Sequence, residues 1–216
     1  GFVRGHTALD IGKIMIVAGA AQLLAAPLAA YLETQLDARK LALAGYAVFA
    51  AGLILNGFEH PRWDFDEFLL PQILRGVAIM FCLLPSTRLA LDGWPRDQLS
   101  DASALFNLMR NLGGAIGIAL VDTVLEQRTP GHITRLVNEL QAGHRATAQF
   151  VGLPLQYFHE KPIGHVDPFT KSLIEPLVKK AAVTISFNEA WLMIGMLFVI
   201  SLPALLLATR ERPRRD

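Results

Sequence analysis

The sequence predicts an all-α membrane protein, with five transmembrane helices and a long, partly helical segment outside the membrane. Two observations support this fold class. Of the 216 residues, 52% are hydrophobic and only 18% are charged, against about 25% charged in ordinary soluble proteins. The apolar residues are also gathered into five blocks, each close to the ~20 residues that a helix needs to cross a hydrocarbon core of ~30 Å.

Three of the predicted spans are apolar on nearly all sides, as contact with lipid requires. The first covers residues 14–32, where Gln22 is the only strongly polar side chain. The second covers residues 41–58, and the fifth covers residues 190–208 and carries no charge. A soluble helix would instead alternate polar and apolar faces with a period of 3.6 residues.

The third and fourth spans are of mixed character, so we expect them to line a polar path. The third covers residues 68–91 and is interrupted by Gln72, Arg75 and Arg88. The fourth covers residues 102–125 and contains Asn107, Arg110, Asn111 and Asp122. A charge inside a bilayer is costly and normally faces the interior of a helix bundle.

Basic residues predict the orientation, because short cytoplasmic loops are enriched in Lys and Arg. One side carries Arg39, Lys40, Arg88, Arg96 and the tail residues Arg210, Arg212, Arg214 and Arg215. The short segments of the other side carry only Arg4, Lys13 and Arg62. We therefore expect a cytoplasmic C-terminus and an N-terminus outside, which implies at least one further span upstream of Gly1.

Residues 126–189 lie outside the membrane in this topology. The run QRTPG at 127–131 predicts that the fourth helix stops and turns, because Pro and Gly break helices. Residues 133–150 predict an amphipathic helix with Ile133, Leu136, Val137 and Leu140 on one face.

The rest of this segment leads into the last span. Residues 151–167 predict a loop, and residues 168–187 predict a second helix, broken at Pro176, that runs into the last span. The predicted organisation is thus residues 1–125 with four transmembrane helices, 126–189 as an extracytoplasmic cap, and 190–216 as the last helix and cytoplasmic tail.

The charged residues of the spans are the first candidates for a substrate or proton pathway. Arg75 and Asp122 lie at similar predicted depths and have opposite charges, so we predict that they pair or share a polar cavity. Asp122 is also close enough to the outer interface to be simply hydrated. Arg110 is deeper, and a functional role and an internal ion pair are equally open to it.

Uncharged residues of the spans complete the candidate site. Asn107 lies one turn from Arg110 and either satisfies its donors or contacts substrate. Gln22 and Gln72 either bond a substrate or join neighbouring helices. Gly113, Gly114 and Gly117 are assigned to helix packing, because small residues allow close approach of helices in lipid.

Several function classes find no support. The net charge of +1 gives no reason to expect nucleic acid. Cys82 is the single cysteine, and the six histidines show no metal-binding spacing. Because five of them, His132 included, fall in loops or loop-helix stretches, we expect them to be solvated. No nucleophile elbow or enzyme constellation is present, and no cofactor is predicted.

Motifs along the whole chain resemble those of one transporter family. They are GHTALDIG at 5–12, LDARK at 36–40, LPQILRG at 70–76, LPST at 84–87, ASALFNLMRNLGGAIG at 102–117 and FNEAW at 187–191. In this order they resemble the second half of EmrB/QacA-type drug:proton antiporters of the major facilitator superfamily, and are closer to EmrB than to QacA.

The resemblance implies the last five spans of a fourteen-span bacterial inner-membrane protein, taken from its C-terminal six-helix bundle. It implies multidrug efflux by proton antiport, with the lipid bilayer, a missing N-terminal half, small amphipathic drugs, protons and a periplasmic membrane-fusion adaptor as partners. The acids that couple protons in this family lie mainly in that other half. The alternative function is a membrane interaction component that docks an adaptor through residues 126–189.

Overall fold

The computed structural model describes residues 5, 7–155 and 168–207, and within them all regular structure is helical. Six helices follow in order: α1 (Ala8–Gln35), α2 (Ala38–Asn56), α3 (Phe65–Leu91), α4 (Leu99–Gln141), α5 (Arg145–Val151) and α6 (Pro168–Leu207). Five of them are long and apolar enough to cross a membrane. The predicted all-α membrane fold is confirmed. The predicted basic tail, Arg4 and most of the predicted loop 151–167 lie outside the described residues.

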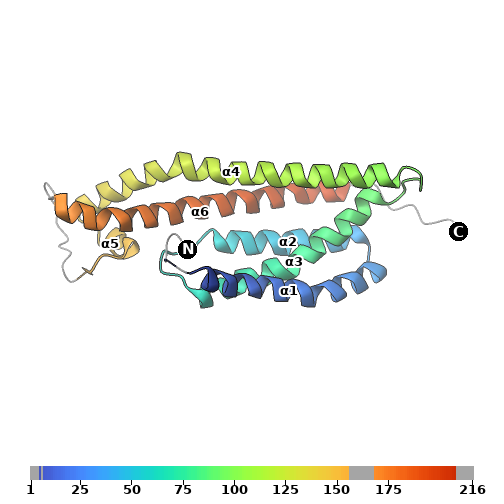
Figure 1. Cartoon of the computed structure of the whole chain (residues 1–216), viewed down its shortest axis with the longest axis horizontal. Coiled ribbons are helices and arrows are strands. Elements are labelled where there is room, and N and C mark those ends of the chain that lie inside the picture. The colour runs from blue at the N-terminus through green and yellow to red at the C-terminus, as the bar shows by residue number, and fades with distance from the viewer. Residues whose placement is uncertain (1–4, 6, 156–167, 208–216) are drawn as a thin grey trace.

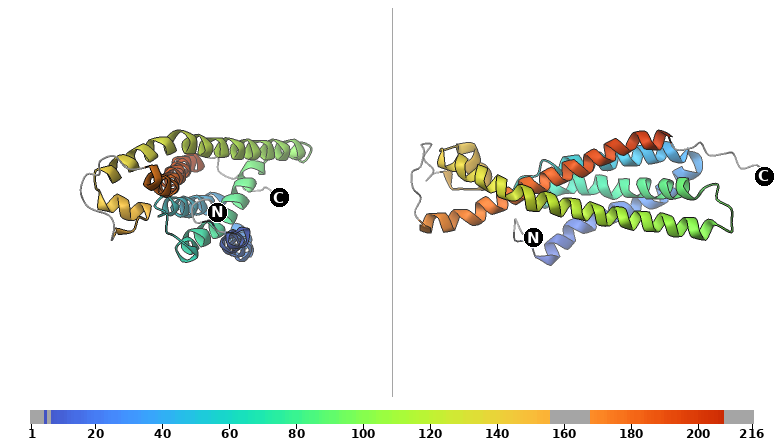
Figure 2. Two further views of the ribbon diagram at one scale, coloured as in Figure 1. Left: turned by 60° about the vertical axis from the view of Figure 1, so that its left-hand side comes forward. Right: turned by 90° about the horizontal axis from the view of Figure 1, so that it is seen from above.

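The helices form two groups that share α2. α3 packs against both α1 and α2, while α6 packs against α2 and α4. α4 and α6 lie side by side and extend together beyond α1, α2 and α3 at one end of the molecule (Figures 1 and 2). We call this the cap end.

Small residues bring the spans together at several points. A Cβ on Gly76 of α3 would collide with the backbone oxygen of Ala18 on α1. A Cβ on Gly195 of α6 would lie 2.9 Å from Cγ1 of Ile54 on α2. Close packing through glycine is a usual way to join helices in lipid, where apolar side chains gain nothing by leaving the solvent.

The prediction that the fourth helix stops at residues 127–131 is wrong. α4 continues through Pro130 and Gly131 to Gln141, and at 1.5 Å per residue it is about 64 Å long, roughly twice a hydrocarbon core. Two residues after Gln141, Gly143 has a φ of +82° and makes the left-handed turn that commonly closes a helix. Packing against α6 holds α4 together across the local breakers.

The second long helix agrees better with expectation. α6 begins at Pro168 and runs without a break into the last span, so the predicted continuity is confirmed and the predicted break at Pro176 is wrong. The single helix predicted at 133–150 is interrupted at Ala142–His144, where α4 gives way to α5. Both long helices cross the boundaries proposed at 125 and 189, and where the membrane surface cuts them stays a prediction.

A small hydrophobic core holds the cap together. It joins the end of α4, α5 and the start of α6 through Leu136, Leu140, Ala148, Val151, Val178, Ala181 and Ala182. Leu136 and Leu140 thus face inward as the periodicity predicts, and Ile133 packs against them. Val137 does not, because its side chain is 37% exposed. The cap is therefore an ordered helical structure.

Candidate functional site

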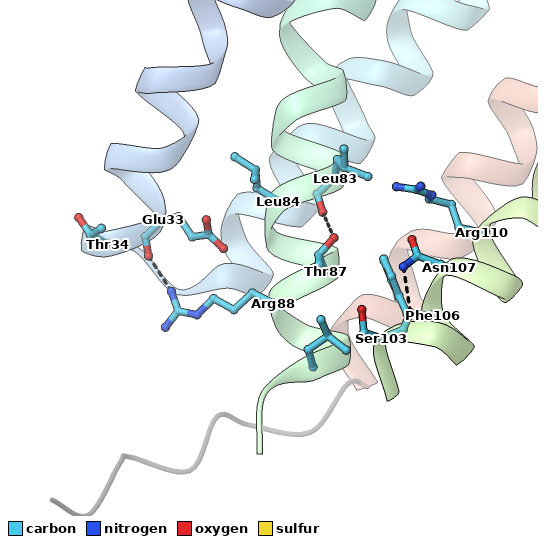
Figure 3. Close-up of a pocket in the computed structure, with 11 residues that line it drawn as sticks. Glu33, Thr34, Leu83, Leu84, Thr87, Arg88, Ser103, Phe106, Asn107 and Arg110 are labelled. Atoms are coloured by element: carbon cyan, nitrogen blue, oxygen red, sulfur yellow. Dashed lines mark hydrogen bonds between the residues drawn. The ribbon is translucent and has the colours of Figure 1, made fainter. Parts of the chain in front are cut away.

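A cavity lies at the end of the spans opposite the cap. The end of α1, the last turns of α3 and the first turns of α4 enclose about 570 Å³ (Figure 3). Its walls are formed by Glu33, Thr34, Leu83, Leu84, Thr87, Arg88, Leu91, Ser103, Phe106, Asn107 and Arg110. Two arginines therefore share a cavity with several leucines and a phenylalanine.

Most polar groups of this cavity already have partners. Nη1 of Arg88 donates to the backbone oxygen of Glu33 at 2.8 Å, which ties α3 to α1. The amide of Asn107 donates to the backbone oxygen of Ser103 at 3.0 Å, one turn back on the same helix. These bonds hold Arg88 and Asn107 in place at the wall (Figure 3).

Arg110 differs from these neighbours. Its side chain extends from α4 toward α3 (Figure 3), and within the described part of the chain it makes no recorded hydrogen bond or ion pair. It lies about 16 Å along α4 from Leu99 and is exposed between the described helices. At its predicted place inside the fourth span, an unpaired guanidinium would call for an anionic or strongly polar partner.

A second cavity of about 310 Å³ adjoins the first and shares Leu83, Phe106 and Arg110 with it. Its other walls are Tyr46, Phe49, Ile79, Cys82, Ser86, Met109 and Phe198. Phe198 of α6 packs on both Tyr46 and Phe49 of α2, with ring centroids 5.3 Å and 4.8 Å apart. Arg110 thus stands between a cavity that also holds Arg88 and Glu33 and an aromatic one.

Of the residues predicted to line a pathway, Asn107 and Arg110 lie in these cavities, whereas Gln22 and Gln72 do not line them. The structure does not bring Arg75 and Asp122 together. Arg75 lies against Trp191 of α6, and Asp122 is exposed on α4. Asp122 therefore has no partner of opposite charge from α3 within the described residues.

The three glycines assigned to helix packing face open space. A Cβ on Gly113, Gly114 or Gly117 would meet no atom of another described residue within 4 Å. The most apolar stretch of α4 is in fact unburied along its whole length. No packing role for these glycines is visible between the described helices.

The structure also reveals a polar contact that the sequence did not indicate. His132 was expected to be solvated, but it is only 9% exposed on α4, so that expectation is wrong. Its Nε2 lies 3.1 Å from Oε1 of Glu189 on α6, without the alignment of a hydrogen bond. Arg128 reaches the other oxygen of Glu189 at 3.6 Å. His132 and Glu189 are far apart in sequence, so their contact becomes visible only when α4 is seen to pack against α6.

The chemistry of a metal site is not found in the described ranges 5, 7–155 and 168–207. They contain no group of three His, Cys, Asp or Glu residues close enough to hold a metal ion. The arrangement offers two adjoining cavities and two arginine side chains at their walls.

Comparison with known proteins gives a family match and several curated relatives. The family model described as Major Facilitator Superfamily matches residues 3–127. The chain is 31% identical to the colistin resistance protein EmrB of Acinetobacter baumannii, over 93% of this chain and 39% of that protein. It is 26% identical to the fatty acid resistance protein FarB of Neisseria gonorrhoeae, over 94% of this chain and 39% of the relative.

A third relative has the same extent. The multidrug export protein EmrB of Escherichia coli K12 is 25% identical over 92% of this chain and 38% of its own length. The chain therefore spans about two fifths of the length of these relatives. No solved structure matches significantly.

Proposed function

The chain belongs to the Major Facilitator Superfamily, and we propose that it forms the C-terminal part of an EmrB-type exporter that moves amphipathic compounds out of the cell in exchange for protons. Its similarity to proteins named for multidrug export and drug resistance supports this proposal. The membrane is then the bacterial inner membrane, and the chain's role is transport.

One observation carries the proposal furthest: Arg110 lies unpaired at the junction of a cationic and an aromatic cavity. A compound with an acidic group at one end and an apolar body would satisfy both chambers. Charge-assisted hydrogen bonds to guanidinium are among the stronger polar contacts in proteins. We therefore propose organic acids with an apolar body as substrates, and the relative named for fatty acid resistance fits that chemistry.

The orientation follows the basic residues. Arg39, Lys40, Arg88 and Arg96 lie at the cavity end of the spans. Because short cytoplasmic loops are enriched in Lys and Arg, we propose that the cavity is on the cytoplasmic side and the cap outside. The C-terminus is then cytoplasmic. Such a cavity is placed to take substrate from the cytoplasm, as an exporter requires.

The exposed face of α4 supports a larger bundle. Gly113, Gly114 and Gly117 offer a flat, small-residue surface with nothing against it, and the relatives are longer than this chain. We propose that this face packs against transmembrane segments of the other half of the complete protein. Arg110 and Asn107 would then lie at the junction of the two halves.

The remaining predicted residues keep their proposed places. Gln22, Gln72, Arg75 and Asp122 stay candidates for the polar pathway of substrate or protons, at positions away from the two cavities. The ordered cap is the surface that we propose for a periplasmic adaptor, as one part of the exporter. Docking as the sole function is not favoured by the relatives' names.

The test measures export by cells that express the complete gene product. The probes are a fluorescently labelled fatty acid and its methyl ester, which differ only in the acidic group. We expect active export of the acid that stops when the proton gradient is dissipated. Arg110→Ala should reduce export of the acid about tenfold or more, because a charged hydrogen bond is lost, and should change export of the ester little.

Arg135→Ala is the matched control, since Arg135 lies on the same helix, in the cap, where its ion pair among the described residues is with Glu139 at 3.6 Å. It should export the acid like the unaltered protein. Equal loss of acid and ester export in Arg110→Ala would remove the proposed substrate class. Absence of export for every probe, with normal membrane expression, would remove the exporter proposal itself.

A further inference from the structure

Five residues form a polar cluster near the cap end of the spans, where α2, α3 and α6 meet. Glu59 follows the end of α2, and its backbone oxygen accepts a hydrogen bond from Nδ2 of Asn188 on α6 at 2.8 Å. Arg75 of α3 holds its guanidinium carbon 4.9 Å from the ring centroid of Trp191 on α6. Asn56, in the last turn of α2, is 1% exposed. We call these residues the Glu59 cluster.

The packing of α2 on α3 places Asn56 on the side of Arg75. Gly52, one turn before Asn56 and so on the same face, would hold a Cβ only 3.0 Å from Cγ of Arg75. The hydrogen bond from the side chain of Asn188 to the backbone oxygen of Glu59 holds the loop after α2 against α6. Three helices therefore hold the cluster in place.

Three buried atoms of the cluster have no hydrogen-bond partner among the described residues: Oδ1 of Asn56, Oδ1 of Asn188 and Nε of Arg75. Two are acceptors and one is a donor. Unpaired buried polar atoms are costly, so each normally has a reason. A carboxyl group suits both kinds of atom, because it donates a hydrogen bond when protonated and only accepts when ionised.

Glu59 supplies such a carboxyl group. Its side chain makes no recorded hydrogen bond or ion pair with a described residue, although it is largely covered. Burial raises the pKa of Glu59 to about 7, and the charge of Arg75 acts in the opposite direction. The carboxyl is therefore balanced between its two charge states near neutral pH.

The other charged groups nearby are directed elsewhere. His60 packs on Phe150 with ring centroids 4.9 Å apart, and Arg62 donates to the backbone oxygen of Gln149 at 3.0 Å. Glu189, beside Asn188, faces His132 and Arg128 of α4. Arg75 is thus the charged residue that acts on the pKa of Glu59, which it lowers.

We propose that Glu59 is a proton-binding site of the transporter, and that its proton controls whether the Arg75 guanidinium lies on Trp191 or turns toward the carboxylate. This inference rests on the proposed function, whose coupling ion it assigns to a residue. In the neutral state the carboxyl proton is donated to one of the unpaired amide oxygens, and Arg75 stays on Trp191. When the proton leaves to water, the carboxylate attracts Arg75 and weakens the contact between α3 and α6.

The experiment follows Trp191 in the purified complete protein as pH is varied. The signal is the part of the tryptophan fluorescence that Trp191→Phe removes. We expect a transition with a midpoint near pH 7 that is absent in Glu59→Gln, which keeps the shape of the side chain without its titration. Asp66→Asn, an exposed carboxyl at the same end of α3, is the matched control and should leave the midpoint unchanged.

A second variant should shift the titration midpoint of Glu59 in a direction that a merely structural role of Arg75 would not predict. Arg75→Gln removes the charge that favours ionised Glu59, so infrared titration of the carboxyl band should show the Glu59 midpoint moved to higher pH. An unchanged Trp191 midpoint in Glu59→Gln, or an unchanged Glu59 midpoint in Arg75→Gln, would overturn the proposal. Because these titrations need no substrate, a titrating Glu59 in a protein that exports no probe would refute only the exporter function.

Discussion

A Cβ atom on Gly45 of α2 would lie 2.5 Å from the carbonyl carbon of Phe81 on α3. At this point the backbone of α3 therefore occupies the space that a side chain on Gly45 would need, and no methyl group fits there. Both residues lie well inside spans. The contact is one of the joins that keep α2 and α3 together, next to the aromatic cavity that opens beside Phe49 and Phe198.

Gly45→Ala should therefore destabilise the protein. The added methyl group meets backbone atoms, and overpacking of this kind costs about 1–3 kcal/mol, more than the helix propensity gained from alanine. Thermal unfolding of the purified complete protein in detergent measures the change. Gly131→Ala is the control, because Gly131 is helical and faces open space, and it should melt at the same temperature or slightly higher. Equal melting of the two variants would contradict the close contact.

A second prediction concerns the hydroxyl groups that join α4 to α6. Oγ1 of Thr129 and Oγ of Ser186 lie 2.9 Å apart, and Ser186 is fully buried. Ser186→Ala and Thr129→Val should each cost about 1 kcal/mol. The double variant should cost less than the sum, because both changes remove the same bond between the two hydroxyl groups. Ser186→Ala also removes the bond from Ser186 to the backbone oxygen of Ala182 at 3.2 Å.

Thr134→Val tests whether loss of any threonine hydroxyl on α4 has this effect. Among the described residues, its hydroxyl group bonds to the backbone oxygen of Pro130 on its own helix, so we expect little change in the melting temperature. Strict additivity of the Thr129 and Ser186 variants would show that the hydroxyl pair does not act as a unit.

The spans could be predicted from the sequence because composition alone decides them. A block of about 20 apolar residues is a local property, and all five blocks correspond to helices. Asn107 and Arg110 could likewise be selected because a polar residue inside such a block needs a reason. The two cavities that they line could not be predicted, because the other walls come from α1, α2, α3 and α6.

The cap could not be predicted in the same way. Pro130 and Gly131 are local signals to stop a helix, and they were overridden by contacts with α6 that come more than 50 residues later, such as Thr129 with Ser186. The same distance hid His132 and Glu189 from sequence reasoning. Nothing in the sequence gave a reason to select Glu59, because its partners Arg75 and Asn188 belong to other helices.

The cap core makes a third prediction possible. Leu136 is 2% exposed among α5 and α6 residues, so Leu136→Ala should leave a cavity and cost about 2–5 kcal/mol of cap stability. Its neighbour Val137 is 37% exposed, and Val137→Ala should change little. Hydrogen exchange of α5 and the first turns of α6 should rise in the first variant and not in the second. Uniform exchange across the spans and the cap would mean that the cap does not open separately.

The last prediction is the pH dependence of the joint between His60 and α5. Burial, and then the charge of Arg62, hold the pKa of His60 below its ordinary value of 6.5. Because the pKa of His60 is lower in the folded state, neutral His60 contributes to the stability of the folded protein. This contribution is complete above the ordinary pKa of 6.5, and it is lost as pH falls through the folded-state pKa. The edge contact with Phe150 should then loosen, because a charged ring is less suited to a covered aromatic surface.

Glu59 must be removed from this measurement because it acts in the opposite direction. Its raised pKa gives stability below pH 4.5 that is lost as pH rises to about 7. In a Glu59→Gln background, the melting temperature should fall as pH is lowered below 6.5, and His60→Phe should flatten that fall while keeping the aromatic contact. His144→Gln, at the exposed start of α5, should not flatten it. If His60→Phe leaves the slope unchanged, protonation of His60 does not govern the docking of α5, and another group must account for any acid sensitivity of the cap.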